Sequence, residues 1–200
     1  TIVNEILKES IKDKHLDLST ISMDNNSIER ERGITILAKP TSIEYKGYKI
    51  NILDTPGHAD FGGEVERIMN MVDGVILVVD SYEGTMPQTR FVLKKALERG
   101  AKPIVVINKV DKESARIKEV VDEVYELFMD LDANEDQLDF KIIYTSAING
   151  TSSLSDDLTK QEKGFHNLLD TIIEEIPEPV GSVEANLQFQ PALLDYSDYT

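Results

Sequence analysis

The sequence predicts an α/β fold, in which a mostly parallel sheet carries helices on both faces. Three short runs of residues are almost wholly apolar, as strands are when helices cover both faces of a sheet; they are residues 75–79, 104–107 and 142–144. Amphipathic segments with a helical repeat separate and follow these runs. Polar loops come directly after several strand ends, which is where α/β folds place their ligand sites.

The other elements follow from the same periodicities in chain order. Residues 1–11 place apolar side chains on one face of a helix that lacks the usual start signals. Residues 42–45 and 48–53 predict an antiparallel hairpin, because Lys46-Gly47 between them favours a tight turn with positive φ. Four further amphipathic helices are expected, over residues 61–72, 88–99, 117–131 and 165–176.

Length and composition predict one domain followed by a linker. The chain has 200 residues, of which 40% are hydrophobic and 29% charged, as in an ordinary globular protein. Pro177 and Pro179 forbid continuation of the preceding helix, so we expect a domain over residues 1–178 and a linker with the beginning of another domain over 179–200. The polar stretch 151–163 is expected to be an irregular insertion.

Charge and cysteine content exclude several classes of protein. The formal net charge is −16, which argues against general adhesion to DNA, RNA or an anionic membrane. The absence of cysteine excludes a disulfide scaffold and a thiolate metal site. No apolar run approaches the length of about 18 residues that a membrane helix needs, so no membrane partner is expected.

A polar turn after residues 48–53 has the chemistry of a phosphate sensor. Asp54, at the end of a strand, can hold magnesium directly or through water. Gly57 leaves its backbone N–H open to a γ-phosphate, and His58 could face an attacking water. A four-residue D-x-x-G string alone is more typical of a simple tight turn.

Thr35, in the string Arg32-Gly33-Ile34-Thr35-Ile36, offers a second contact with the same ligand. Its hydroxyl could bind magnesium and its backbone N–H a γ-phosphate, so that the loop responds to the presence of that phosphate. The alternative is that residues 34–36 are simply a β edge.

The string Asn108-Lys109-Val110-Asp111 follows a buried strand and indicates guanine recognition. The Asp111 carboxylate has two adjacent acceptors that match the N1–H and the 2-amino group of guanine, an arrangement that adenine lacks. Lys109 can lay its methylene stem over the base, and Asn108 can join neighbouring loops. The alternative is a solvated surface loop.

The turn at Thr145-Ser146-Ala147 completes this base pocket. It follows the last predicted strand, and its small residues leave the backbone of Ala147 open. The Ala147 N–H can donate to guanine O6, at which position adenine carries a donor instead.

Together, the strings at residues 32–36, 54–58, 108–111 and 145–147 resemble the translational GTPases, which share a Ras-like P-loop G domain. Residues 61–67, 86–90 and 131–140 are more specific, and resemble the BipA/TypA ribosome-associated translational GTPases. The resemblance covers nearly the whole chain.

This resemblance implies a GTPase that uses GTP/GDP and Mg²⁺. Thr35 and Asp54 would be the magnesium residues, Gly57 would contact the γ-phosphate, and His58 would be catalytic. It further implies the ribosome (large-subunit RNA and proteins) as partner, a cytoplasmic location, roles in stress-related translation and large-subunit assembly, and a β-barrel domain beginning within residues 179–200. The residues implied in guanine binding are Asn108, Lys109, Val110, Asp111, Ser146 and Ala147.

One departure from the family pattern concerns the phosphate-binding loop. The family opens with a strand and a G-x-x-x-x-G-K-[ST] loop, and neither is present here. The absent strand would be central, between the strands that end at Asp54 and Asp80. We therefore expect a GTPase in the parent protein and poor nucleotide binding by this chain. The alternative is a degenerate, non-hydrolysing G domain that acts as an interaction module.

Overall fold

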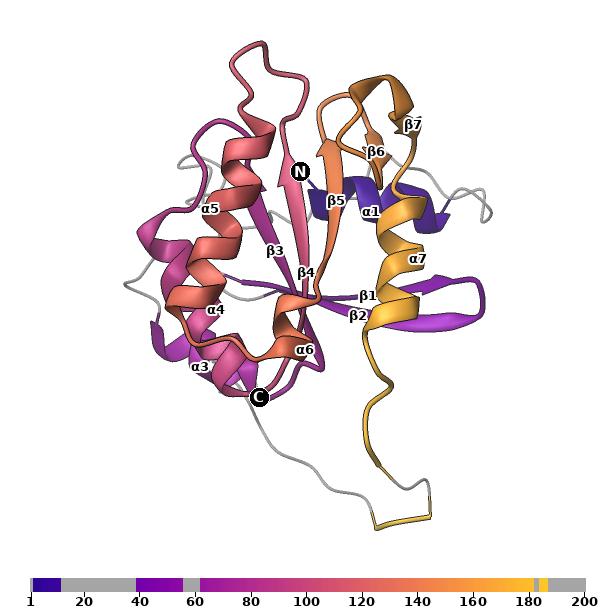
Figure 1. The fold of residues 1–200 in the computed structure, drawn as a ribbon. Coiled ribbons are helices and arrows are strands. Elements are labelled where there is room, and N and C mark those ends of the chain that lie inside the picture. The colour runs from indigo at the N-terminus through magenta and orange to yellow at the C-terminus, as the bar shows by residue number, and fades with distance from the viewer. Residues whose placement is uncertain (1, 12–38, 56–61, 182–183, 187–200) are drawn as a thin grey trace, which may run out of the picture.

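The structure, a computed structural model, describes residues 2–11, 39–55, 62–181 and 184–186. These residues form two sheets surrounded by helices (Figure 1). None of the described helices is long and apolar enough to cross a membrane. In chain order the elements are α1 (Ile2–Ile11), β1 (Lys39–Tyr45), β2 (Tyr48–Asp54), α3 (Gly62–Met69), β3 (Gly74–Asp80), α4 (Pro87–Glu98), β4 (Lys102–Asn108), α5 (Ile117–Asp130), α6 (Glu135–Leu138), β5 (Lys141–Ser146), β6 (Thr151–Ser153), the 3-10 helix η3 (Leu158–Lys160), β7 (Glu162–Lys163) and α7 (His166–Glu175).

The larger sheet has five strands in the order β3-β4-β5-β6-β7, and its first three strands are parallel. These three are the apolar runs of the sequence. Their register places Asp80 beside Asn108, and Asn108 beside Thr145. The carboxyl ends of all three strands therefore lie at one edge of the sheet, which is the upper edge in Figure 1.

Helices cover both faces of this sheet, as the sequence predicts. Successive side chains of a strand point to opposite faces, so Val105 and Ile107 pack in one core cluster while Ile104 and Val106 pack in another. The first cluster contains the buried faces of α4 and α5, and the second those of α1 and α7. β4 thus contributes to a core cluster on each face of the sheet, and a third, smaller cluster joins α3 to α4.

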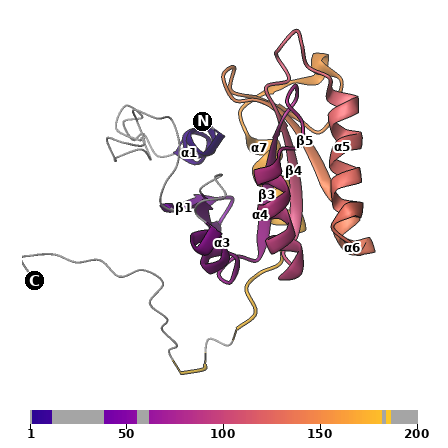
Figure 2. The same cartoon turned by 90° about the vertical axis from the view of Figure 1, so that its left-hand side faces the viewer.

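The smaller sheet is the β1–β2 hairpin, whose turn has Gly47 at positive φ, as expected, and Lys46 at positive φ as well. It is not hydrogen-bonded to the five-stranded sheet, and Figure 2 shows α1, β1 and α3 to one side of that sheet. An open groove of about 1290 Å³ is lined by both β2 and β3. Within the described residues no strand lies between β2 and β3, so the expected absence of a central strand stays a prediction.

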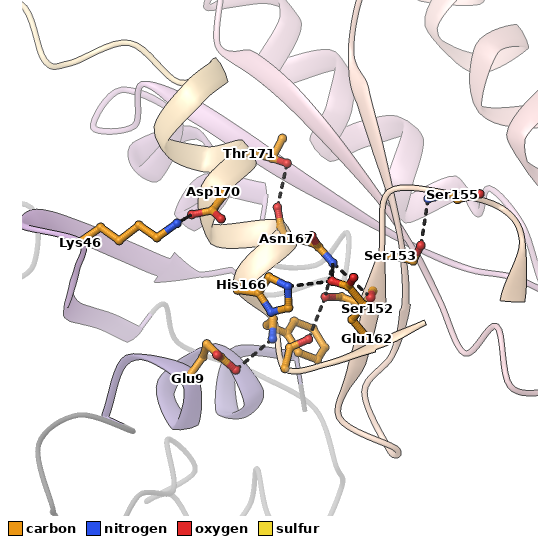
Figure 3. Close-up of polar contacts among 12 residues, drawn as sticks. Glu9, Lys46, Ser152, Ser153, Ser155, Glu162, His166, Asn167, Asp170 and Thr171 are labelled. Carbon is orange, nitrogen blue, oxygen red and sulfur yellow. Dashed lines mark hydrogen bonds and ion pairs between the residues drawn. The ribbon is translucent and has the colours of Figure 1, made fainter. Parts of the chain in front are cut away.

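Polar contacts at α7 tie the two sheets together (Figure 3). Lys46, in the hairpin turn, places its Nζ 2.6 Å from Oδ1 of Asp170 on α7. The carboxylate of Glu9 on α1 accepts a hydrogen bond of 3.1 Å from the backbone N–H of Phe165, just before α7. Helix α7 is therefore the common support of α1 and the hairpin.

The expectation of an irregular insertion over residues 151–163 is wrong. This segment forms β6, η3 and β7, and extends the sheet in antiparallel fashion. Ser152 and Ser153 are buried, and the Ser152 hydroxyl donates to the carbonyl of Gly164 at 2.8 Å. Asn167 on α7 also donates to the Ser152 carbonyl (Figure 3). Pairing and burial thus organise a segment whose composition alone is typical of a loop.

Candidate functional site

The candidate site is built on the loops that follow β3, β4 and β5. Because these strands are parallel and in register, residues 80–85, 108–111 and 145–147 come together although they are far apart in sequence. This edge holds the six residues expected at guanine. Asp54, at the end of β2, is the only described residue of those expected at the phosphates and metal.

Asn108 joins the loop after β4 to the loop after β5. Its side chain is 9% exposed, and its Oδ1 accepts from the Thr145 hydroxyl at 3.1 Å and from the Ala147 N–H at 3.2 Å. The Val110 N–H donates to the carbonyl of Thr145 at 3.2 Å. Residues 108–111 and 145–147 are therefore held as one unit before any base is present.

The backbone of Lys109 is in the left-handed region, with φ 65°. This conformation is unfavourable for a residue with a β-carbon. Ser81, which is fully buried, holds it in place: its hydroxyl donates to the Lys109 carbonyl at 2.8 Å, and its N–H donates to the Asn108 carbonyl at 2.9 Å. The loop after β3 thus supports the backbone of the loop after β4.

Asp80 holds the other end of Lys109. Its Oδ2 lies 2.5 Å from the Lys109 Nζ and 3.5 Å from that of Lys112, while its Oδ1 accepts from the N–H groups of Tyr82 and Glu83. Desolvation, the largest influence, raises the pKa of Asp80, but the hydrogen bonds from Lys109 and the two N–H groups outweigh it and lower that pKa to about 2. Asp80 is ionised at neutral pH.

The remaining residues expected at guanine differ in exposure. Asp111 is exposed, as a residue must be to meet a ligand edge, whereas the Val110 side chain is 1% exposed and packs in the core. Ser146 is buried and its hydroxyl accepts from the Asn149 N–H at 3.3 Å. The Ala147 N–H already donates to Asn108, so guanine O6 would share that donor in a three-centre bond.

The phosphate side of the site is described only at Asp54. Thr35, Gly57 and His58 lie outside the described residues. Asp54 is half-buried at the carboxyl end of β2, paired in register with Lys39. A carboxylate suits magnesium, but the described part of the chain contains no group of three or more acidic or histidine side chains that could hold a metal. The magnesium site therefore stays a prediction.

Sequence reasoning missed Asp80 and Ser81 as parts of this site. The signal that could have found Asp80 is an acid ending a fully apolar strand, GVILVVD, immediately before a polar loop. Ser81 carried no such signal, because its role depends on the register of β3 against β4.

The fold and these loops define a G domain of the translational GTPase class. Residues 1–178 match the family described as the elongation factor Tu GTP binding domain, and the chain belongs to this family.

Proteins named BipA are similar to this chain over most or all of its length. The chain is 65% identical over 178 residues to the large ribosomal subunit assembly factor BipA of Bacillus subtilis (strain 168), a match that covers 89% of this chain and 29% of that protein. It is 52% identical over 200 residues to the factor of the same name from Salmonella typhimurium, covering 100% of this chain and 33% of the other. The resemblance to BipA/TypA is therefore confirmed. The chain spans about a third of the length of these relatives.

Solved structures agree on the fold. The bacterial selenocysteine-specific elongation factor EF-Sec superposes with a TM-score of 0.61 at 28% identity, covering 78% of this chain and 24% of that one. The elongation factor SelB from Methanococcus maripaludis, solved with the GTP analogue GPPNHP, gives 0.59 at 24% identity, covering 76% and 31%. The expected G-domain fold is confirmed.

Proposed function

We propose that this chain is the guanine-nucleotide-binding part of a ribosome-associated GTPase that acts in large-subunit assembly and stress-related translation in the cytoplasm. The observation that carries the proposal is the joined pair of loops, 108–111 and 145–147, at the strand ends of a domain of the elongation factor Tu family. The ribosomal role rests on relatives named large ribosomal subunit assembly factor.

The base would be selected by an exposed carboxylate beside two fixed loops. Asp111 would accept from the N1–H and 2-amino groups of guanine, and Ala147 would donate from its backbone to O6. The stem of Lys109 would cover one face of the ring. Asn108 and Ser146 would act indirectly, by holding the backbone that makes these contacts.

Hydrolysis would depend on the predicted phosphate residues. Thr35 and Asp54 would hold magnesium, which, when bound, neutralises charge on the phosphate oxygens. Gly57 would offer its N–H to the γ-phosphate. His58 would orient or polarise the attacking water, as a general base must do from within hydrogen-bonding reach.

Purine selection gives the direct test of this function. In the complete protein that contains these residues, Asp111→Asn should weaken GDP binding by about 100-fold, because the amide sets a donor against a guanine donor. The same variant should gain affinity for xanthosine diphosphate, whose 2-oxo group accepts that donor.

Asp130→Asn removes the same charge from an exposed ion pair with Arg90, and serves as the matched control. Unchanged purine choice in Asp111→Asn, or a preference of the natural protein for ATP, would contradict the proposal. Both are read from nucleotide titrations.

The chain by itself is proposed to bind nucleotide weakly, because it contains no G-x-x-x-x-G-K-[ST] string to cradle the phosphates. Titration with a fluorescent GDP analogue should give a dissociation constant well above micromolar. Sub-micromolar binding by this chain would refute this part of the proposal.

The second candidate function is that of an interaction module that does not hydrolyse GTP. The absence of a G-x-x-x-x-G-K-[ST] string from this chain supports it as well. Sedimentation of the complete protein with large ribosomal subunits separates the two functions. A GTPase switch should co-sediment with the subunits more strongly when it has bound a non-hydrolysable GTP analogue than when it has bound GDP. An interaction module without nucleotide control should co-sediment equally in both cases.

A further inference from the structure

The loop after β3 contains an acid whose two oxygens have different tasks. Oδ1 of Asp80 is fixed by the N–H groups of Tyr82 and Glu83, at 2.9 and 3.3 Å. This leaves Oδ2 directed at the Lys109 ammonium, 2.5 Å away. The Asp80 side chain is only 12% exposed, compared with 49% for Lys109. The carboxylate is therefore a fixed anchor, and the lysine is the group that it orders.

The anchor is itself supported by α5. Arg116, just before that helix, donates from its Nε to the Tyr82 carbonyl at 2.7 Å and from its backbone N–H to the Ser81 carbonyl at 2.9 Å. The Arg116 guanidinium also pairs with Glu123 on α5. A chance surface ion pair has no such support, so the position of Asp80 is specified by the fold.

Lys109 is consequently held at both ends. Ser81 fixes its backbone in the left-handed conformation, and Asp80 fixes its ammonium. A free lysine side chain loses much rotamer freedom when it is ordered. Ordering it before the ligand arrives removes that cost from binding, which is the general benefit of preorganisation.

We propose that Asp80 is a positioning residue of the guanine site, which holds the Lys109 side chain extended across the place where one face of the base lies. The inference rests on the proposed function, since it requires Lys109 to cover guanine. Asp80 itself does not touch the nucleotide. It acts on the face of the ring, whereas Asp111 acts on its edge.

A double-mutant cycle in the complete protein tests this coupling. Asp80→Asn should weaken GDP binding by about tenfold when Lys109 is present, because the ordered lysine is lost. In a Lys109→Met background, the same change should alter GDP affinity by less than about twofold. Asp130→Asn, with the same change in charge, should have no effect in either background.

Inosine diphosphate adds a readout that general damage would not reproduce. It has the same ring faces as GDP but lacks the 2-amino group. Asp80→Asn should therefore weaken both nucleotides equally, while Asp111→Asn should weaken GDP more than inosine diphosphate. A larger loss for GDP than for inosine diphosphate in Asp80→Asn would overturn the proposal.

The cycle also decides between failure of the inference and failure of the proposed function. An equal loss of GDP affinity with and without Lys109 would overturn the positioning role alone. If Lys109→Met and Asp111→Asn both leave GDP binding unchanged, the guanine site itself is refuted.

If Asp80→Asn does not fold, Asp80→Glu replaces it. The displaced carboxylate should lower GDP affinity only when Lys109 is present. An equal effect on GDP affinity in both backgrounds would overturn the proposal.

Discussion

The five-stranded sheet and the β1–β2 hairpin are stabilised in different ways. In β4 the four residues 104–107 are all fully buried, because helices cover both faces of the sheet. The hairpin, in contrast, buries Ile43 of β1, and β2 has no fully buried residue. The larger sheet, whose strand ends carry the loops expected at guanine, therefore has the more completely buried core. The half that carries Asp54 depends on contacts with α1 and α7.

The same difference separates the two parts of the predicted site. Residues 80–85, 108–111 and 145–147 hold each other through hydrogen bonds within the larger sheet. Asp54 lies across the groove between β2 and β3, on the other sheet. The residues expected at the base and Asp54, expected at the metal, thus lie on separate sheets, which share the core cluster that contains residues of α1 and α7.

A matched pair of core substitutions would break or support this comparison most directly. Ile143 on β5 and Ile43 on β1 are 0% and 5% exposed and belong to the same core cluster. Ile143→Ala should cost about 4 kcal/mol of unfolding free energy and Ile43→Ala about 2, because the hairpin can adjust around the smaller side chain. Urea unfolding of this chain measures both.

Hydrogen exchange extends that test. In Ile43→Ala, the amides of β1 and β2 should exchange faster while those of β4 keep their protection. Equal losses of stability in the two variants, with uniform exchange, would show that the hairpin and the large sheet unfold as one unit.

The pH dependence of stability tests the larger sheet at Asp80, the last residue of β3. The pKa of Asp80 is about 2 in the folded chain, below its ordinary value of 3.8. A carboxyl with a lowered folded pKa adds stability that is present above its unfolded pKa and disappears as the pH falls through the folded value. Asp80 should thus contribute about 2 kcal/mol above about pH 5, lost progressively towards pH 2.

The measurement is the difference in unfolding free energy between the natural chain and Asp80→Asn across that range. The difference should shrink as the pH falls from about 5 to 2. A difference that stays constant with pH would mean that ionised Asp80 gains nothing from its partners. Asp130→Asn controls for the loss of one negative charge.

The smallest effect is expected at the ion pair that links the hairpin turn to α7. Lys46 and Asp170 have side chains that are 59% and 34% exposed, so water and salt screen their attraction. Asp170→Asn should lower the urea midpoint only slightly, and not at all in about 1 M sodium chloride. A large loss that persists in high salt would indicate that this contact, rather than apolar packing, holds the hairpin.

Much of the fold could be predicted from the sequence, because its strands and helices have clear periodicities. The expected helices agree with α3, α4, α5 and α7 to within a few residues at their ends. Helix α6 was missed because it has only four residues, although Asn134 and Gln137 cap it reciprocally. β6 and β7 were missed because their side chains are polar and their order comes from pairing.

The candidate site was predictable where a local string carries the chemistry. Asn108, Asp111 and Ala147 were singled out in this way; the structure brings their loops together, and their role at guanine stays a prediction. Asp80 and Ser81 were not, because their roles arise from the alignment of β3 with β4 and from a left-handed residue in a neighbouring loop. Contacts of this kind depend on register between distant segments, which a pattern along one segment does not contain.

The open side of β3 has a consequence for the behaviour of the chain in solution. β3 is the edge strand of its sheet among the described residues, it is almost entirely apolar, and Val78 near its end is 46% exposed. Such an edge presents unpaired backbone donors and acceptors to any strand that meets it. At high concentration, this chain should therefore self-associate by pairing of β3 with a strand of another molecule. A segment that pairs with β3 within the same molecule should prevent this association.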